Sequence, residues 1–125
     1  MKKLQEEISM INEELQHWFE HTDTLVNELL EDGTNDEVYH TIEHHFASED
    51  FDLLEKAAIA AFKLGFEIEE PEEAELENGD KVFAFDIVTE QMLSAELLRA
   101  ETQQMFELAQ KCKVDYDGWG TYFEE

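Results

Sequence analysis

The chain has 125 residues, of which 33 are acidic and 8 are basic, so its formal net charge at neutral pH is −25. With 42% hydrophobic and 11% aromatic residues, it can build the core of one domain and is not a disordered polyelectrolyte. Its charge argues against direct contact with nucleic acid or with anionic membranes, and no run of about 18 apolar residues predicts a membrane span.

Residues 3–31 are predicted to form one long amphipathic helix. Their apolar side chains alternate between spacings of four and three residues, as in the seam of two packed helices, at Leu4, Ile8, Ile11, Leu15, Trp18, Thr22, Leu25 and Leu29. Gly33 follows this pattern and suits the left-handed position at which a helix ends. We expect the half nearest Gly33 to pack on its own domain. For residues 3–18 two interpretations remain, namely packing on the domain or presentation to a partner or a second copy.

Residues 38–47 are rich in β-branched and aromatic types and predict a strand, although Val38, Ile42 and His45 also fit the spacing of a helix. Ser48 is the predicted N-cap of a helix that follows this strand. The apolar stripe of that helix consists of Phe51, Leu54, Ala57, Ala58, Ala61 and Phe62. Its alanines predict close packing against a flat surface such as a sheet.

Two further strands are predicted to be joined by Asn78-Gly79, the dipeptide most typical of a hairpin turn. The first of them, residues 66–76, is strongly acidic and is interrupted near Pro71. The second, residues 81–88, alternates its side chains so that one face carries Phe83, Phe85 and Ile87.

Another helix begins near Ser94, and a last strand follows that is bent or bulged around Gly118 and Gly120. After the first helix, the predicted order is therefore β-α-β-β-α-β. This order indicates an α+β fold of the ferredoxin-like type, a sandwich with two helices on one face of a four-stranded antiparallel sheet, to which the long N-terminal helix is added. We expect one globular domain overall, with the helix in residues 1–33 and the sandwich in residues 34–125.

His40, His44 and His45 are candidate metal ligands. On a strand, His40 and His44 share one face but lie about 13 Å apart, which is too far for one zinc ion, and His45 points to the opposite face. On a helix, His40 and His44 would be neighbours and could share an ion. His17 and His21 are four residues apart on the predicted first helix but form an incomplete ligand set. Because the strand is favoured, we predict no metal and no cofactor, with one imidazole packed and hydrogen-bonded and the others at the surface.

Acidic pairs are too frequent in this chain to identify a catalytic site. Glu69-Glu70 and Glu72-Glu73 are interpreted as a solvated acidic rim, because nothing near them predicts the burial that would shift the pKa of a catalytic carboxyl. No nucleophile elbow, calcium loop or phosphate-binding glycine loop occurs, so no sequence motif points to a class of enzyme. The single cysteine, Cys112, lies on the predicted core stripe and fits a reducing cytoplasm.

The most distinctive segment of the chain lies near its end and reads Tyr116-Asp117-Gly118-Trp119-Gly120-Thr121-Tyr122-Phe123. Glycines on both sides of Trp119 allow close approach of backbone or partner atoms. Trp119 then has two interpretations. It is either an aromatic that a bulge turns into the core, or an anchor on a recognition surface, where Trp and Tyr dominate binding energy.

Together with Ile42-Glu43-His44-His45-Phe46, this aromatic segment makes residues 25–125 resemble the RraB family, the protein regulators of ribonuclease E activity. The resemblance implies a ferredoxin-like α/β sandwich. It also implies a non-enzymatic inhibitor that binds the endoribonuclease away from its active site and alters RNA cleavage and the composition of the degradosome. The matched motifs carry no catalytic assignment.

We therefore hypothesise that the protein acts by binding to ribonuclease E or another basic protein segment. Opposite charge and aromatic anchors would hold the two together. The partner-binding residues of this hypothesis are Trp119, Tyr122, Glu43, His44, His45, Glu69, Glu70, Glu72 and Glu73. Two alternatives remain open: a metal-dependent hydrolase that uses the histidines, and a structural homo-oligomer, a dimer built on the N-terminal helix.

Overall fold

The structure, a computed structural model, describes residues 2–35 and 37–121, with side chains from residue 9 onward. Three helices and five strands follow one another as α1 (Lys2–Glu31), β1 (Tyr39–Ser48), α2 (Phe51–Lys63), β2 (Glu67–Ile68), β3 (Glu72–Glu75), β4 (Lys81–Met92), α3 (Ala95–Cys112) and β5 (Asp115–Thr121). Residues 39–48 are thus a strand, as the β-branched and aromatic composition predicts.

The strands form one antiparallel sheet in the order β2-β4-β1-β5, with β3 also paired to β4. This order and the succession of elements confirm the predicted α+β sandwich with an added N-terminal helix. The sheet has five strands where four were predicted, because the acidic strand is split into β2 and β3 on either side of Pro71. Proline has no backbone N–H to donate to a neighbouring strand, so pairing is interrupted there.

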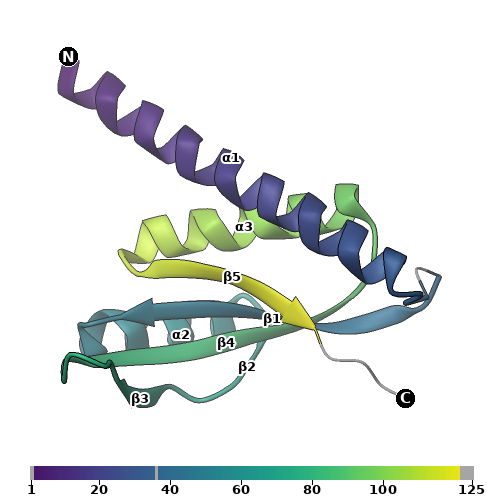
Figure 1. The fold of residues 1–125 in the computed structure, drawn as a ribbon. Helices are drawn as coiled ribbons and strands as arrows, with labels where there is room; N and C mark the ends of the chain where they lie inside the picture. Colours follow the sequence, from purple (N-terminus) through teal and green to yellow (C-terminus); the bar gives the residue numbers. More distant parts are fainter. Residues whose placement is uncertain (1, 36, 122–125) are drawn as a thin grey trace.

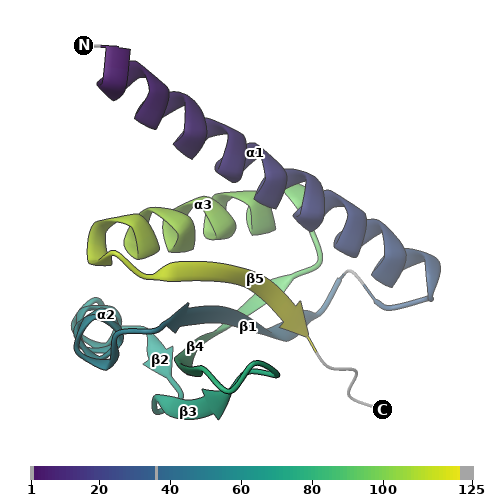
Figure 2. The same cartoon turned by 60° about the vertical axis from the view of Figure 1, so that its left-hand side comes forward.

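Helices α2 and α3 lie side by side on one face of the sheet, and α1 lies outside α3 and β5 (Figures 1 and 2). On β1, Ile42, His44 and Phe46 point toward the helices and are buried, while Glu43 and His45 between them face the other way. The main core between the sheet and its helices is built from Phe46, Leu54, Ala57, Ala61, Phe85, Ile87, Met105 and Phe106. The opposite face of the sheet therefore carries the polar side chains of β1, among them Glu43 and His45.

Local capping explains most of the helix boundaries. The N–H groups of Gly33 and Thr34 donate to the carbonyls of Leu30 and Leu29, and Gly33 has the predicted positive φ of 87°. The predicted N-cap of α2 is wrong by two residues. Asp50 takes that position and its carboxylate accepts from the N–H of Leu53, whereas the Ser48 hydroxyl accepts from the N–H of Asp50.

Helix α1 packs on the domain through its carboxyl-terminal half, as predicted, and Leu15 and Trp18 further toward its amino-terminal end also pack against the main core. Thr22, Val26 and Leu29 are buried there, whereas Met10 is 60% exposed. The ribbon shows α1 diverging from α3 and β5 toward its amino-terminal end (Figure 1). Within the described residues, no helix combines the length and the apolar character that crossing a membrane requires.

The predicted bulge in the last strand is present at Gly118. The pairing of β1 with β5 changes register between His44 and Phe46, opposite this glycine, which has a φ of 92°. A Cβ atom at Gly118 would lie 2.9 Å from Cζ3 of Trp18, so the absence of a side chain lets α1 approach the strand. The bulge also turns Tyr116 and Trp119 both toward the helices, where both are buried.

We expect Gly118→Ala to lower the free energy of unfolding by about 2 kcal/mol, because alanine is strained at this positive φ and would also displace Trp18. Gly33→Ala is the matched control. It has a similar φ of 87° with no atom within 4 Å, so strain alone should cost about 1 kcal/mol. Equal losses for both variants in urea denaturation would show that the contact with Trp18 does not constrain α1.

Candidate partner-binding surface

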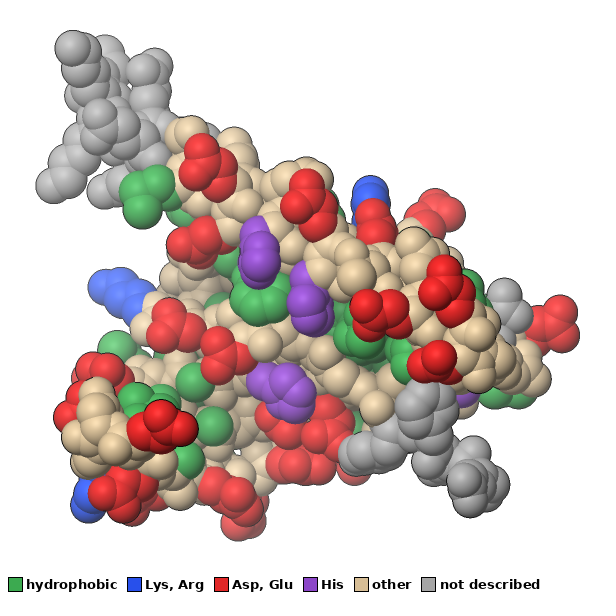
Figure 3. Space-filling view, viewed as in Figure 1, with side chains coloured by type: hydrophobic (Ala, Val, Ile, Leu, Met, Phe, Trp, Pro, Cys, Tyr) green, Lys and Arg blue, Asp and Glu red, His purple; other side chains and the backbone are tan. Residues whose placement is uncertain are grey.

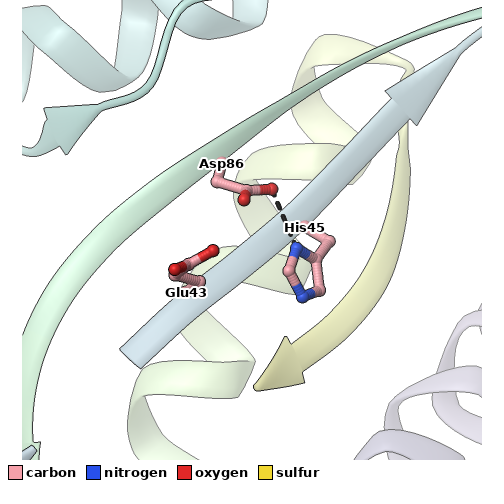
Figure 4. Close-up of side chains that lie close together, drawn as sticks. All are labelled: Glu43, His45 and Asp86. Atoms are coloured by element: carbon pink, nitrogen blue, oxygen red, sulfur yellow. Dashed lines mark hydrogen bonds and ion pairs between the residues drawn. The ribbon is translucent and has the colours of Figure 1, made fainter. Parts of the chain in front are cut away.

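The uncovered face of the sheet brings Glu43 and His45 of β1 next to Asp86 of β4. His45 and Asp86 are direct partners in the antiparallel register, and Nδ1 of His45 lies 2.8 Å from Oδ1 of Asp86 (Figure 4). Glu43 is two positions from His45 on the same strand, so its side chain lies on the same face. All three side chains are partly exposed and reach solvent.

This cluster has the composition of a weak cation site. Glu43, His45 and Asp86 each offer one ligand atom, and these atoms lie within 4.8 Å of one another. A divalent ion there would have to replace the hydrogen bond between His45 and Asp86. The other two candidate metal ligands on this strand already have partners. Both ring nitrogens of His44 are hydrogen-bonded inside the protein, and Nε2 of His40 is hydrogen-bonded to the Asn35 carbonyl oxygen.

The acidic residues predicted as a rim surround a hollow beside this cluster. Glu69, Glu70, Glu72 and Glu73 line a space of about 240 Å³ together with Asp86. The carboxylate of Glu43, with smaller contributions from burial and from Asp86, raises the pKa of Glu69. Carboxylates from β1, β4 and the segment around β3 are therefore crowded enough to repel one another, and a bound cationic group would relieve that repulsion.

Two of the hypothesised contact residues are inside the protein. The Trp119 side chain is 4% exposed, and its Nε1 donates to the Thr22 hydroxyl at 3.0 Å. His44 is fully buried. The structure therefore supports the core interpretation of Trp119, and neither side chain is exposed at the surface. Tyr122 lies outside the described residues.

His44 belongs to a buried polar network that the sequence analysis missed. Glu101 of α3 lies 2.8 Å from Nε2 of His44 and also accepts hydrogen bonds from Thr89 and Gln91, while Nδ1 of His44 lies 2.9 Å from the Tyr116 hydroxyl. Burial acts to raise the pKa of Glu101, but the hydrogen bonds from His44 and Thr89 outweigh it, so the pKa lies below its ordinary value. Glu101 is therefore ionised at neutral pH.

The expectation of one packed imidazole is confirmed by His44, and His45 is partly exposed. Asp86 was not among the hypothesised contact residues, although its alternation with the buried Phe85 and Ile87 places it on the uncovered face. The space-filling view shows acidic side chains spread over the visible face, with histidine side chains gathered near its middle (Figure 3). Exposed carboxylates of this kind attract cationic groups.

The family model and the relatives that match this chain carry the same description. The family described as "Regulator of ribonuclease activity B" matches residues 19–121. A protein of that name from Colwellia psychrerythraea is 83% identical over 116 residues, which cover 93% of this chain and 100% of the relative. The protein of the same name from Escherichia coli K12 is 50% identical over 113 residues, covering 90% of this chain and 82% of the relative.

A further relative, from Pseudoalteromonas translucida, is 49% identical over 111 residues, covering 89% of this chain and 100% of its own length, and carries the same name. The family match includes the uncovered sheet face, the acidic hollow and the buried His44 network, and it begins within α1 at residue 19. On the extent of the family match and the identity to these relatives, the chain belongs to the family of regulators of ribonuclease activity B.

Proposed function

We propose that this chain is a non-enzymatic regulator that binds ribonuclease E away from its active site, and that it thereby inhibits or modulates RNA cleavage and the composition of the degradosome. Family membership supports a ribonuclease as the partner, because the relatives are named regulators of ribonuclease activity. The observation that carries the mode of action is the crowded carboxylate surface formed by Glu43, Glu69 and Asp86 with the acidic hollow beside it.

The charge of the chain decides which part of a nuclease it would bind. A net charge of −25 repels RNA, so the chain would act on the enzyme and not on its substrate. A basic segment of the nuclease is the complementary target, since opposite fields speed the encounter of two proteins. We place this encounter in the cytoplasm, in keeping with a single cysteine and no disulfide.

The test is a titration of purified ribonuclease E with this chain, in the presence and absence of a non-cleavable RNA oligonucleotide. Cleavage of a fluorescent RNA should decrease as the chain is added, while the dissociation constant stays the same with the RNA bound. Competition between the chain and the oligonucleotide would refute binding away from the active site. Cleavage by the chain alone would refute the non-enzymatic role.

The exposed acids of the hollow should contribute most of the electrostatic attraction. We expect the double variant Glu70→Lys, Glu72→Lys to weaken binding to ribonuclease E by about tenfold or more, chiefly through slower association. The matched control is Glu28→Lys, Glu31→Lys on α1, which changes the net charge equally at exposed positions away from the sheet face. Surface plasmon resonance at low and high salt would measure both, and equal losses for the two pairs would argue against a localised site.

A further inference from the structure

A second hollow lies away from the uncovered sheet face and is lined by residues of α1, α3 and β5. Figure 1 shows that α1 diverges from α3 toward its amino-terminal end. Its volume is about 450 Å³, within the range of sites that hold a ligand or a few side chains. The aromatic side chains that line it are Trp18, Phe106 and Tyr116. Its acidic side chains are Glu13, Glu14, Asp115 and Asp117. We call this feature the aromatic groove.

The floor of the aromatic groove is held rigidly. Phe106 and Tyr116 are buried, and the Trp18 ring packs edge-on against Tyr116 with ring centroids 5.2 Å apart. Gly118 permits this packing, since a Cβ there would lie 2.9 Å from the Trp18 ring. A guest side chain would therefore meet a preorganised apolar surface, which reduces the entropic cost of binding.

The rim of the aromatic groove is anionic. Glu13 and Glu14 come from α1, whereas Asp115 and Asp117 come from β5, so carboxylates stand on two sides of the floor. Among the described residues that line the groove there is no lysine or arginine to neutralise them. Burial and the neighbouring Asp115 raise the pKa of Asp117, and they outweigh a smaller opposing effect of His45.

We propose that the aromatic groove holds an arginine-bearing segment of the partner protein, which rests on the function proposed above. A planar guanidinium group stacks on aromatic rings and forms paired hydrogen bonds with carboxylates, and this groove offers the partly exposed Trp18 ring beside four carboxylates. A lysine ammonium group is more strongly hydrated and cannot make the paired contact. A second copy of this chain is disfavoured as the occupant, because its own exposed acids would face Glu13 and Glu14.

The probe for the experiment is the tripeptide Arg-Gly-Arg with blocked ends, titrated into the ¹⁵N-labelled full chain. Of the two tryptophans, Trp18 lines the groove and Trp119 is buried, so their indole N–H signals report the groove and the core separately. The Trp18 signal should shift and saturate while the Trp119 signal stays in place. Movement of neither signal, or of both together, would overturn the proposal, as would equally tight binding of Lys-Gly-Lys.

Charge reversal tests the rim. Glu13→Lys, Glu14→Lys should weaken binding of the arginine peptide by about tenfold or more, while Glu28→Lys, Glu31→Lys on the same helix should weaken it by less than about threefold. Equal effects of the two pairs would overturn the proposal. The peptide experiment does not involve the nuclease, so it stands whether or not ribonuclease E is the partner.

The two variants are then assayed with ribonuclease E. Loss of inhibition by Glu13→Lys, Glu14→Lys alone would support the groove as a contact with the nuclease. Full inhibition by that variant, together with loss of peptide binding, would refute the groove as the partner site while leaving the proposed function intact. Sedimentation of the wild-type chain completes the test, because a dimer that excludes the peptide would identify a second copy as the occupant.

Discussion

Replacement of Trp119 by alanine should lower the free energy of unfolding by about 3–5 kcal/mol, as for other large aromatic side chains removed from a core. Trp119 packs with Val26, Leu29, Ile42 and Leu98, so α1, β1 and α3 all lose contacts when its ring is removed. The variant also loses the hydrogen bond that its indole donates to Thr22. Urea denaturation followed by circular dichroism measures the change.

A second substitution at the same position separates packing from hydrogen bonding. Trp119→Phe keeps an aromatic ring in the core but removes the indole N–H, so we expect a smaller loss of about 1–2 kcal/mol. The contrary result would be a Trp119→Ala variant that is as stable as the wild type but no longer binds the partner. In that case Trp119 would be an anchor that leaves the core when the complex forms.

The second large effect is expected at Glu101. Glu101→Ala removes the carboxylate that accepts hydrogen bonds from His44, Thr89 and Gln91, and it leaves those donors unpaired inside the protein. We expect the free energy of unfolding at pH 7 to fall by about 3 kcal/mol, in the range found when one partner of a buried pair is removed. Glu107→Ala on the same helix is the control, because Glu107 is exposed and its loss should cost less than about 0.5 kcal/mol.

The difference in stability between the wild type and Glu101→Ala should depend on pH. The folded state holds the pKa of Glu101 below its ordinary value of 4.5, so the unfolded chain binds the proton more tightly than the folded one. The stabilisation is therefore complete above pH 4.5 and is lost as the pH falls through the lower, folded pKa. The stability difference between wild type and Glu101→Ala should shrink over that interval. A difference that stays constant down to acid pH would contradict the assigned role of the carboxylate.

Much of the fold is accessible from local patterns. The β-branched and aromatic residues of 38–47, the Asn78-Gly79 turn and Gly33 at the end of α1 each predicted the element that the structure contains. Local patterns failed where two positions compete for one role. Ser48 and Asp50 are both good N-caps, and which of them caps α2 depends on where β1 stops pairing with β4, a property of the whole sheet.

The candidate surfaces depended on contacts that local patterns do not contain. His45 and Asp86 are 41 residues apart and meet only through the register of β1 and β4. In the sequence, nothing distinguishes Glu101 from the other polar residues of its helix. Only the packing of α3 on the sheet places it beside His44. The aromatic groove likewise requires the divergence of α1 from α3, which no spacing of apolar residues in α1 predicts.

The interruption at Pro71 limits how other chains can join the sheet. On the β2 and β3 side, the outermost strands are only two and four residues long, and both carry glutamates. At the opposite margin, the Gly118 bulge breaks the regular ladder of β5. Within residues 37–121, neither margin offers the long, regular row of free amides and carbonyls on which an extra strand could be templated. Self-association into β-aggregates is thereby discouraged.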